Sequence, residues 1–152
     1  MKPLRAVFTL LLVAIATVLV GCGDPDVQAP PTYTSEKIAQ LQLYLTPFSD
    51  AQERLAELGK DVEKNDWTNV KSVIHGPFGT LRASAENVNR ILLKKDQKQA
   101  ITLSKALFND LEKLDIAADP NIPANATAAY QAAVRDLDAY LDFIPTQPDS
   151  DT

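Results

Sequence analysis

The chain contains very few of the residues from which disulfide bonds, metal centres and haem sites are built. Its 152 residues include one cysteine, one histidine and one methionine, and the methionine is Met1. A single cysteine excludes an intrachain disulfide, and a single histidine excludes the paired Glu-x-x-His motifs of di-iron bundles. His75 is therefore only a weak candidate for a metal ligand, and we expect its ring to hydrogen-bond to nearby backbone. No cofactor is expected apart from a possible lipid.

The sequence also lacks the arrangements that organise a catalytic nucleophile. Its serines have no second histidine and no Gly-x-Ser-x-Gly segment beside them, and the pair Gly76 and Gly79 is too sparse for a phosphate-binding loop. The net charge of −5 argues against nucleic acid, and against an anionic membrane surface as the main contact. Net charge still permits a local basic patch that meets an acidic partner, but does not place it. We therefore expect a protein that is not an enzyme and has no small-molecule substrate.

The first 21 residues have the pattern of a lipoprotein signal peptide. Lys2 and Arg5 precede an uncharged apolar run over 6–20, which is shorter than the roughly 20 residues of a membrane span. The run ends in Leu19-Val20-Gly21-Cys22, which has the form of a lipobox. The thiol of Cys22 would take a diacylglyceryl group, and further fatty acyl chains would make the anchor firm, because one chain alone binds only marginally. The alternative is an ordinary signal peptide with an incidental cysteine.

Apolar residues recur at steps of three and four along four segments, as they do on one face of an α-helix. These stripes predict helices over 34–63, 66–94, 96–118 and 125–144. No run shows the period-two alternation of a strand, and the whole chain has five glycines. The prediction is an all-α fold, an up-down-up-down four-helix bundle over 34–145. Residues 22–33 should form a lipidated, proline-containing flexible tether, and 146–152 a disordered tail.

Polar residues before each stripe predict where the helices begin. The expected caps are, in chain order, Thr34 or Ser35, Asn65 or Asp66, Asp96, and Asn125. Their short side chains can accept hydrogen bonds from the free backbone N–H groups of a first turn. The segment Asp96-Gln97-Lys98-Gln99 also has the Asp-x-x-Gln form of a capping box, which predicts the start of the third helix.

Prolines fall inside two of the predicted helices. Pro47 lies within the first stripe, and Gly76-Pro77 interrupts the second, which runs from Trp67 to Leu92. Proline lacks a backbone N–H and clashes with the preceding turn. We therefore expect a kink or a short break near Leu45 and another at Gly76-Pro77.

Several short segments, in their order and spacing, resemble the PsbQ family in its cyanobacterial lipoprotein form. The similar segments are Thr32-Tyr33-Thr34-Ser35-Glu36-Lys37-Ile38-Ala39-Gln40-Leu41-Gln42, Trp67, Ile74-His75-Gly76-Pro77-Phe78-Gly79, Leu81-Arg82, Lys95-Asp96-Gln97, Leu111-Glu112-Lys113-Leu114-Asp115, Ala117 and Tyr130. No single segment is diagnostic. Together with the lipobox, the resemblance covers essentially the whole predicted mature domain, from about Tyr33 to Pro145.

The resemblance implies a non-catalytic extrinsic subunit on the lumenal side of photosystem II, anchored to the thylakoid membrane by lipid. Such a subunit stabilises the oxygen-evolving assembly and helps to hold its manganese–calcium cluster and chloride in place. The implied partners are the core antenna proteins and the other extrinsic subunits. Plant members differ in having a longer N-terminal arm and no lipobox, so their modes of attachment do not transfer directly. The alternatives are a generic periplasmic or lumenal lipoprotein adaptor with a helical-bundle interaction domain, and a metal-binding module built on His75.

Overall fold

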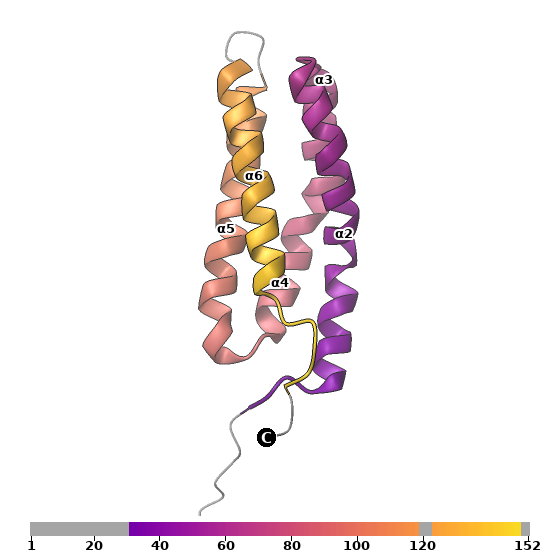
Figure 1. Ribbon diagram of the computed structural model, residues 1–152, viewed down its shortest axis with the longest axis vertical. Helices are drawn as coiled ribbons and strands as arrows, with labels where there is room; N and C mark the ends of the chain where they lie inside the picture. The colour runs from indigo at the N-terminus through magenta and orange to yellow at the C-terminus, as the bar shows by residue number, and fades with distance from the viewer. Residues whose placement is uncertain (1–30, 119–122, 150–152) are drawn as a thin grey trace, which may run out of the picture. The chain divides into compact units, whose positions relative to one another are not determined.

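The computed structural model describes residues 31–118 and 123–149, and every regular element within those ranges is a helix. The elements are α2 (Ser35–Glu63), α3 (Trp67–His75), the 3-10 helix η1 (Pro77–Thr80), α4 (Leu81–Ile91), α5 (Lys94–Ala117) and α6 (Pro123–Phe143). Since α3, η1 and α4 follow one another along one side of the bundle, they form one interrupted rod (Figure 1). The prediction of an all-α fold with four helical rods is confirmed for this part of the chain. The predicted signal peptide, and the tether as far as residue 30, lie outside the described residues.

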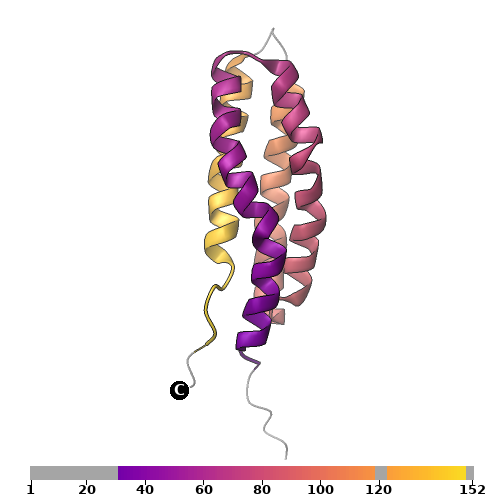
Figure 2. The same ribbon diagram turned by 90° about the vertical axis from the view of Figure 1, so that its right-hand side faces the viewer.

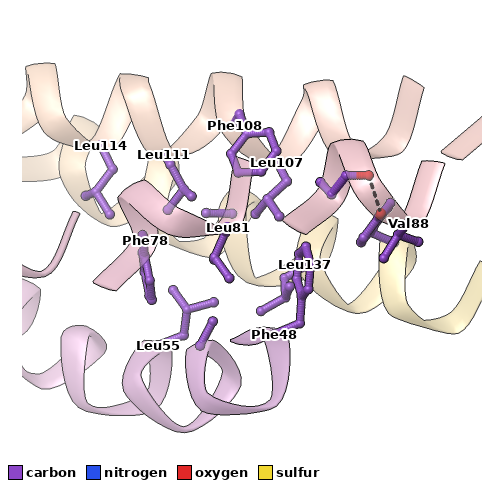
Figure 3. Close-up of a cluster of buried hydrophobic side chains, with 14 of the residues drawn as sticks. Phe48, Leu55, Phe78, Leu81, Val88, Leu107, Phe108, Leu111, Leu114 and Leu137 are labelled. Atoms are coloured by element: carbon purple, nitrogen blue, oxygen red, sulfur yellow. Dashed lines mark hydrogen bonds between the residues drawn. The ribbon is translucent and has the colours of Figure 1, made fainter. Parts of the chain in front are cut away.

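The four rods run antiparallel to their neighbours in the chain and pack around a common core (Figures 1 and 2). Their apolar stripes supply the side chains that are almost completely buried. The largest of these are Tyr140, Phe48, Leu41, Leu58, Leu81, Leu107, Leu114, Leu137, Val70 and Val88. Figure 3 shows side chains of α4, α5 and α6 meeting those of α2 at the centre of this core. Among the described helices, none has the length and the apolar character needed to cross a membrane.

Pro47 does not interrupt the first rod, so of the two alternatives expected near Leu45, a kink or a short break, the break is wrong. The helix α2 runs without a gap from Ser35 to Glu63 with Pro47 inside it, and Figure 2 shows it curving along the bundle. The side chains of Phe48, the next residue, and of Ala51, one turn further on, are buried in the core. Packing of this face against the other rods outweighs the loss of one backbone hydrogen bond.

The second rod is interrupted at Gly76, so the break expected at Gly76-Pro77 within the segment 66–94 is confirmed. The helix α3 ends at His75, and Pro77 begins the 3-10 turn η1. A Cβ at Gly76 would lie 2.8 Å from the carbonyl oxygen of Ser72, which explains why a residue without a side chain stands there. The interruption lets Phe78 insert into the core, where it is 3% exposed.

Two of the expected caps are confirmed. Thr34 Oγ1 accepts a hydrogen bond of 3.3 Å from the backbone N–H of Lys37, and Asp66 Oδ1 accepts one of 3.2 Å from that of Asn69. Asn65 lies before Asp66 and has a left-handed backbone conformation with φ of 58°. Asparagine tolerates this region better than most residues, so it reverses the chain between the first two rods.

The other two expected caps are wrong. The helix α5 begins at Lys94 after Leu93, so Asp96 lies inside its first turn. The helix α6 begins at Pro123, so Asn125 lies in its first turn, where it is exposed. Proline suits the first helical position because the N–H that it lacks would have no partner there.

Asp96 instead belongs to a set of four hydrogen bonds around Tyr33, which we call the Tyr33 clasp. The Tyr33 hydroxyl donates to Asp96 Oδ2 at 2.7 Å and accepts from the backbone N–H of Leu93 at 3.2 Å. The Tyr33 N–H donates to Asp149 Oδ2 at 2.9 Å, and the Asp149 N–H donates to the Tyr33 carbonyl at 3.0 Å. The clasp thus joins both ends of the described chain to the turn between α4 and α5.

The clasp corrects two predictions about the ends of the domain. Residue 33 was expected in the flexible tether, but its ring is 4% exposed and part of the core. The tail was expected to be disordered from residue 146, but Asp149 pairs with Tyr33. A tyrosine can bury a ring and still satisfy its hydroxyl group, so one residue orders both segments. Burial, followed by the hydrogen bond to Asp96, raises the pKa of the Tyr33 hydroxyl.

Candidate docking surface

The residues singled out from the sequence do not come together as a metal site within the described residues. Cys22 lies outside the described residues. His75 is exposed, and its Nε2 atom lies 2.9 Å from Asp115 Oδ1 of α5. The expected hydrogen bond from this ring to backbone is therefore wrong. Within 31–118 and 123–149 no three or more His, Cys, Asp or Glu side chains gather as they would around a metal ion.

The structure instead shows a groove between α4 and α5, which we call the basic groove. It has a volume of about 290 Å³. Its defining residues are Arg82, Glu86, Arg90, Ile101, Lys105 and Phe108. Three of these carry a positive charge and one a negative charge, so the groove is basic although the whole chain is acidic.

Hydrogen bonds beneath the groove fix the relative positions of three helices. Asn89 of α4 donates through Nδ2 to Ser104 Oγ of α5 at 3.0 Å, and Tyr140 of α6 donates to Asn89 Oδ1 at 3.1 Å. Ser104 Oγ in turn donates to the carbonyl of Ile101 at 3.2 Å. Buried polar groups that are all paired hold one arrangement firmly. The groove is therefore preformed, and every buried side-chain nitrogen or oxygen beneath it has at least one hydrogen-bond partner.

Arg82 divides this groove from a second depression. Its guanidinium carbon lies 4.6 Å from the centre of the Phe108 ring, a geometry that favours a cation–π contact. Both residues also line the neighbouring hollow, a depression of about 200 Å³ bordered by Ile74, Phe78, His75 and the carboxylates of Glu112 and Asp115. The two depressions therefore form one furrow along α5, with a positively charged side chain at its middle.

Two carboxylates face each other at the contact between α5 and α6. Asp110 is 8% exposed and pairs with Lys113 one turn along α5. Asp136 of α6 faces Asp110, and the pKa of Asp136 is raised by burial first and then by the carboxylate of Asp110. Arg135 and Lys113 oppose this shift only in part. Ionised Asp136 therefore destabilises the folded chain.

We expect Asp136→Asn to stabilise the protein at neutral pH. A carboxyl group with a raised pKa in the folded state binds its proton more tightly than in the unfolded state, so the wild type gains stability as the pH falls through that pKa towards the unfolded value. The Asp136→Asn variant has no carboxyl group to titrate there, so its stability should not show this gain as the pH falls. Urea unfolding between about pH 4 and about pH 7 measures the difference. Asp142→Asn, an exposed change on the same helix, is the control, and equal effects of the two changes would contradict the prediction.

With the helical bundle and its surface described, comparison with known proteins decides the family. The sequence profile described as "PsbQ: Oxygen evolving enhancer protein 3" matches residues 4–145. The chain belongs to the PsbQ family. A PsbQ relative from Synechocystis sp., named CyanoQ, is 40% identical over 146 residues, which cover 95% of this chain and 98% of the relative. The resemblance inferred from short sequence segments is therefore confirmed.

Sequence reasoning about this PsbQ chain missed the basic groove, although a signal for it exists. Arg82, Glu86 and Arg90 stand four residues apart and so share one face of α4. Lys105 and Phe108 are separated by three residues and share a face of α5. Residue spacing within each helix does not predict that these two faces meet, because their contact depends on how the second and third rods pack.

Proposed function

We propose that this chain is a non-catalytic extrinsic subunit of photosystem II on the lumenal side of the thylakoid membrane. The observation that carries the proposal is the match to the PsbQ profile across 4–145, with the CyanoQ relative covering nearly the same length. A match over the whole fold supports a shared role better than a short motif does. A rigid bundle with a charged surface furrow suits a subunit that acts by binding.

The bound bundle would stabilise the oxygen-evolving complex by covering it. A subunit packed over a manganese–calcium–chloride site limits the exchange of water and ions beneath it. In the described residues, every fully buried side-chain nitrogen or oxygen of a non-exposed residue has a hydrogen-bond partner. Such complete pairing supports a stable bundle, because a buried polar group without a hydrogen-bond partner would lower the stability of the fold.

A lipid on Cys22 would keep this cover at the membrane. A tethered protein meets a complex in the same membrane at a high effective concentration, so a weak contact between the two is sufficient. The sequence around Cys22 supports this part of the proposal through its lipobox form. The contact surface and the anchor would then act together, with neither strong enough alone.

Co-purification tests the proposed function. The native lipoprotein, carrying an affinity tag after Thr152, is captured from detergent-solubilised membranes, and the bound subunits are identified by mass spectrometry. Photosystem II core antenna proteins and other extrinsic subunits should be enriched. Capture of an unrelated envelope complex without photosystem II subunits would instead support a generic lipoprotein adaptor.

Cys22→Ala should deplete the protein from membranes and from purified photosystem II. The reason is the loss of the acyl chains, whose burial contributes roughly 0.8 kcal/mol for each CH₂ group. Immunoblots of membrane and soluble fractions measure the change, and circular dichroism checks that the helices persist. Equal membrane retention of wild type and variant would refute the anchoring part alone.

A further inference from the structure

We propose that the basic groove, together with the neighbouring hollow, binds an acidic segment of a protein subunit of photosystem II. This inference rests on the proposed function and identifies the surface and the partner chemistry through which it would operate. The partner segment would place carboxylates against Arg82, Arg90 and Lys105 and would insert apolar side chains into the two depressions.

The first argument is charge. In a chain with net charge −5, three cationic side chains border one groove with a single carboxylate among them, that of Glu86. The neighbouring hollow carries the carboxylates of Glu112 and Asp115, so the partner's acidic side chains would lie in the basic groove and only apolar ones in the hollow. The two ion pairs found within 31–118 and 123–149 are His75–Asp115 and Lys113–Asp110, so none of the groove's three cations is held in an ion pair by a carboxylate of the described residues. Arg90 is held by the side-chain oxygen of Asn87, which is uncharged. An acidic partner would supply the missing negative charge.

The second argument concerns the position of Arg82. Stacking on the Phe108 ring holds its guanidinium at the boundary between the two depressions. A planar guanidinium held in this way can bind a carboxylate through two parallel hydrogen bonds, and less side-chain entropy is lost because the group is already positioned. The geometry therefore favours an Asp or Glu side chain at the middle of the bound segment.

The third argument is shape. The groove's volume of about 290 Å³ lies just below the range of roughly 300–1,000 Å³ for small-molecule sites, and its buried polar groups are already paired. The furrow extends along α5 from Gln97 to Asp115, or about 27 Å at a helical rise of 1.5 Å per residue. An extended peptide of about eight residues has this length. A protein segment with apolar side chains near its two ends fits better than a compact ligand.

A membrane surface is the weaker occupant. The acidic bundle would be repelled by an anionic bilayer, and a flat layer of headgroups would leave the apolar side chains of Ile101 and Phe108 uncovered. Ile101, whose side chain borders the groove, is 39% exposed and would gain contacts only from a side chain that enters it. A protein partner satisfies both the charge and the apolar surface.

Charge reversal tests the inference. The double variant Arg82→Glu with Lys105→Glu is compared with a control, Arg54→Glu with Lys60→Glu, which makes the same change in net charge at exposed positions of α2. Each full-length lipoprotein, purified in detergent, is titrated onto photosystem II particles from a strain that lacks the subunit. The groove variant should bind at least about tenfold more weakly, with a flatter dependence on salt, while the control changes by less than about threefold.

A single variant separates binding from folding. Lys105→Glu leaves the contact between Arg82 and Phe108 in place and should still weaken binding severalfold, with an unchanged melting curve. Binding of the double variant at wild-type strength would overturn the groove proposal and leave the proposed function intact. Failure of the wild type itself to bind would overturn the proposed function. Loss of binding to phosphatidylglycerol vesicles on charge reversal, with photosystem II binding unchanged, would assign the groove to the membrane and overturn the inference.

Discussion

Replacing Leu107 by alanine should lower the free energy of unfolding by about 2–5 kcal/mol. Leu107 is 1% exposed and lies where side chains of α4, α5 and α6 meet in the core (Figure 3). Its removal takes apolar surface away from the core and leaves a cavity that rigid neighbouring helices close only in part. Urea unfolding followed by circular dichroism at 222 nm measures the effect.

The control for this prediction is Leu43→Ala. Leu43 is on α2 and 74% exposed, so its removal should change the free energy of unfolding by less than about 0.5 kcal/mol. The two changes delete the same atoms and differ only in burial. A loss below about 1 kcal/mol for Leu107→Ala, or equal losses for both variants, would show that the core is not packed as described.

Replacing Tyr33 by alanine should cost about 3–5 kcal/mol, and replacing it by phenylalanine about 1–3 kcal/mol. The alanine variant loses a ring that is 4% exposed as well as the hydroxyl group. The phenylalanine variant keeps the ring but leaves the N–H of Leu93 and the carboxylate of Asp96 without the Tyr33 hydroxyl. Urea unfolding of both variants separates the contribution of the ring from that of the hydroxyl.

Tyr44→Phe provides the matched control for the hydroxyl. Tyr44 is half-buried on α2, and the loss of its hydroxyl should have little effect on unfolding. A Tyr33→Phe variant as stable as the wild type would mean that water can replace the two hydrogen bonds of the Tyr33 hydroxyl without loss of stability. Hydrogen exchange at the Asp149 N–H, which bonds to the Tyr33 carbonyl, should also become faster in Tyr33→Ala because the partner segment is released.

The four rods could be predicted because their physical basis is local. Burial of one face requires apolar residues at helical spacing, and residues such as Leu41, Val88 and Leu137 keep that spacing and are buried. Pro47 shows the limit of local reasoning, since tertiary packing kept α2 intact. At Gly76-Pro77 the α-helix ended and a 3-10 turn followed. The same residue type therefore had two outcomes that depended on its surroundings.

The ends of the helices and the candidate surface depended on contacts between residues far apart in the chain. Asp96 had the spacing of a cap, but its carboxylate accepts a hydrogen bond from Tyr33, 63 residues earlier. The basic groove likewise requires the face of α4 that carries Arg82 to meet the face of α5 that carries Phe108. A single sequence contains both faces but not their pairing. For the same reason, the groove became visible only with the packed bundle.

The clasp also determines how the domain responds to force on its N-terminal side. Any pull on the chain that precedes Tyr33 reaches this residue before it reaches the first turn of α2. Two of its hydrogen bonds run to Asp149 and two to the start of the α5 rod, so tension spreads over three segments instead of peeling one helix from its end. When force acts on the N-terminal side of the domain, α2 should therefore stay folded until the four hydrogen bonds of the clasp break.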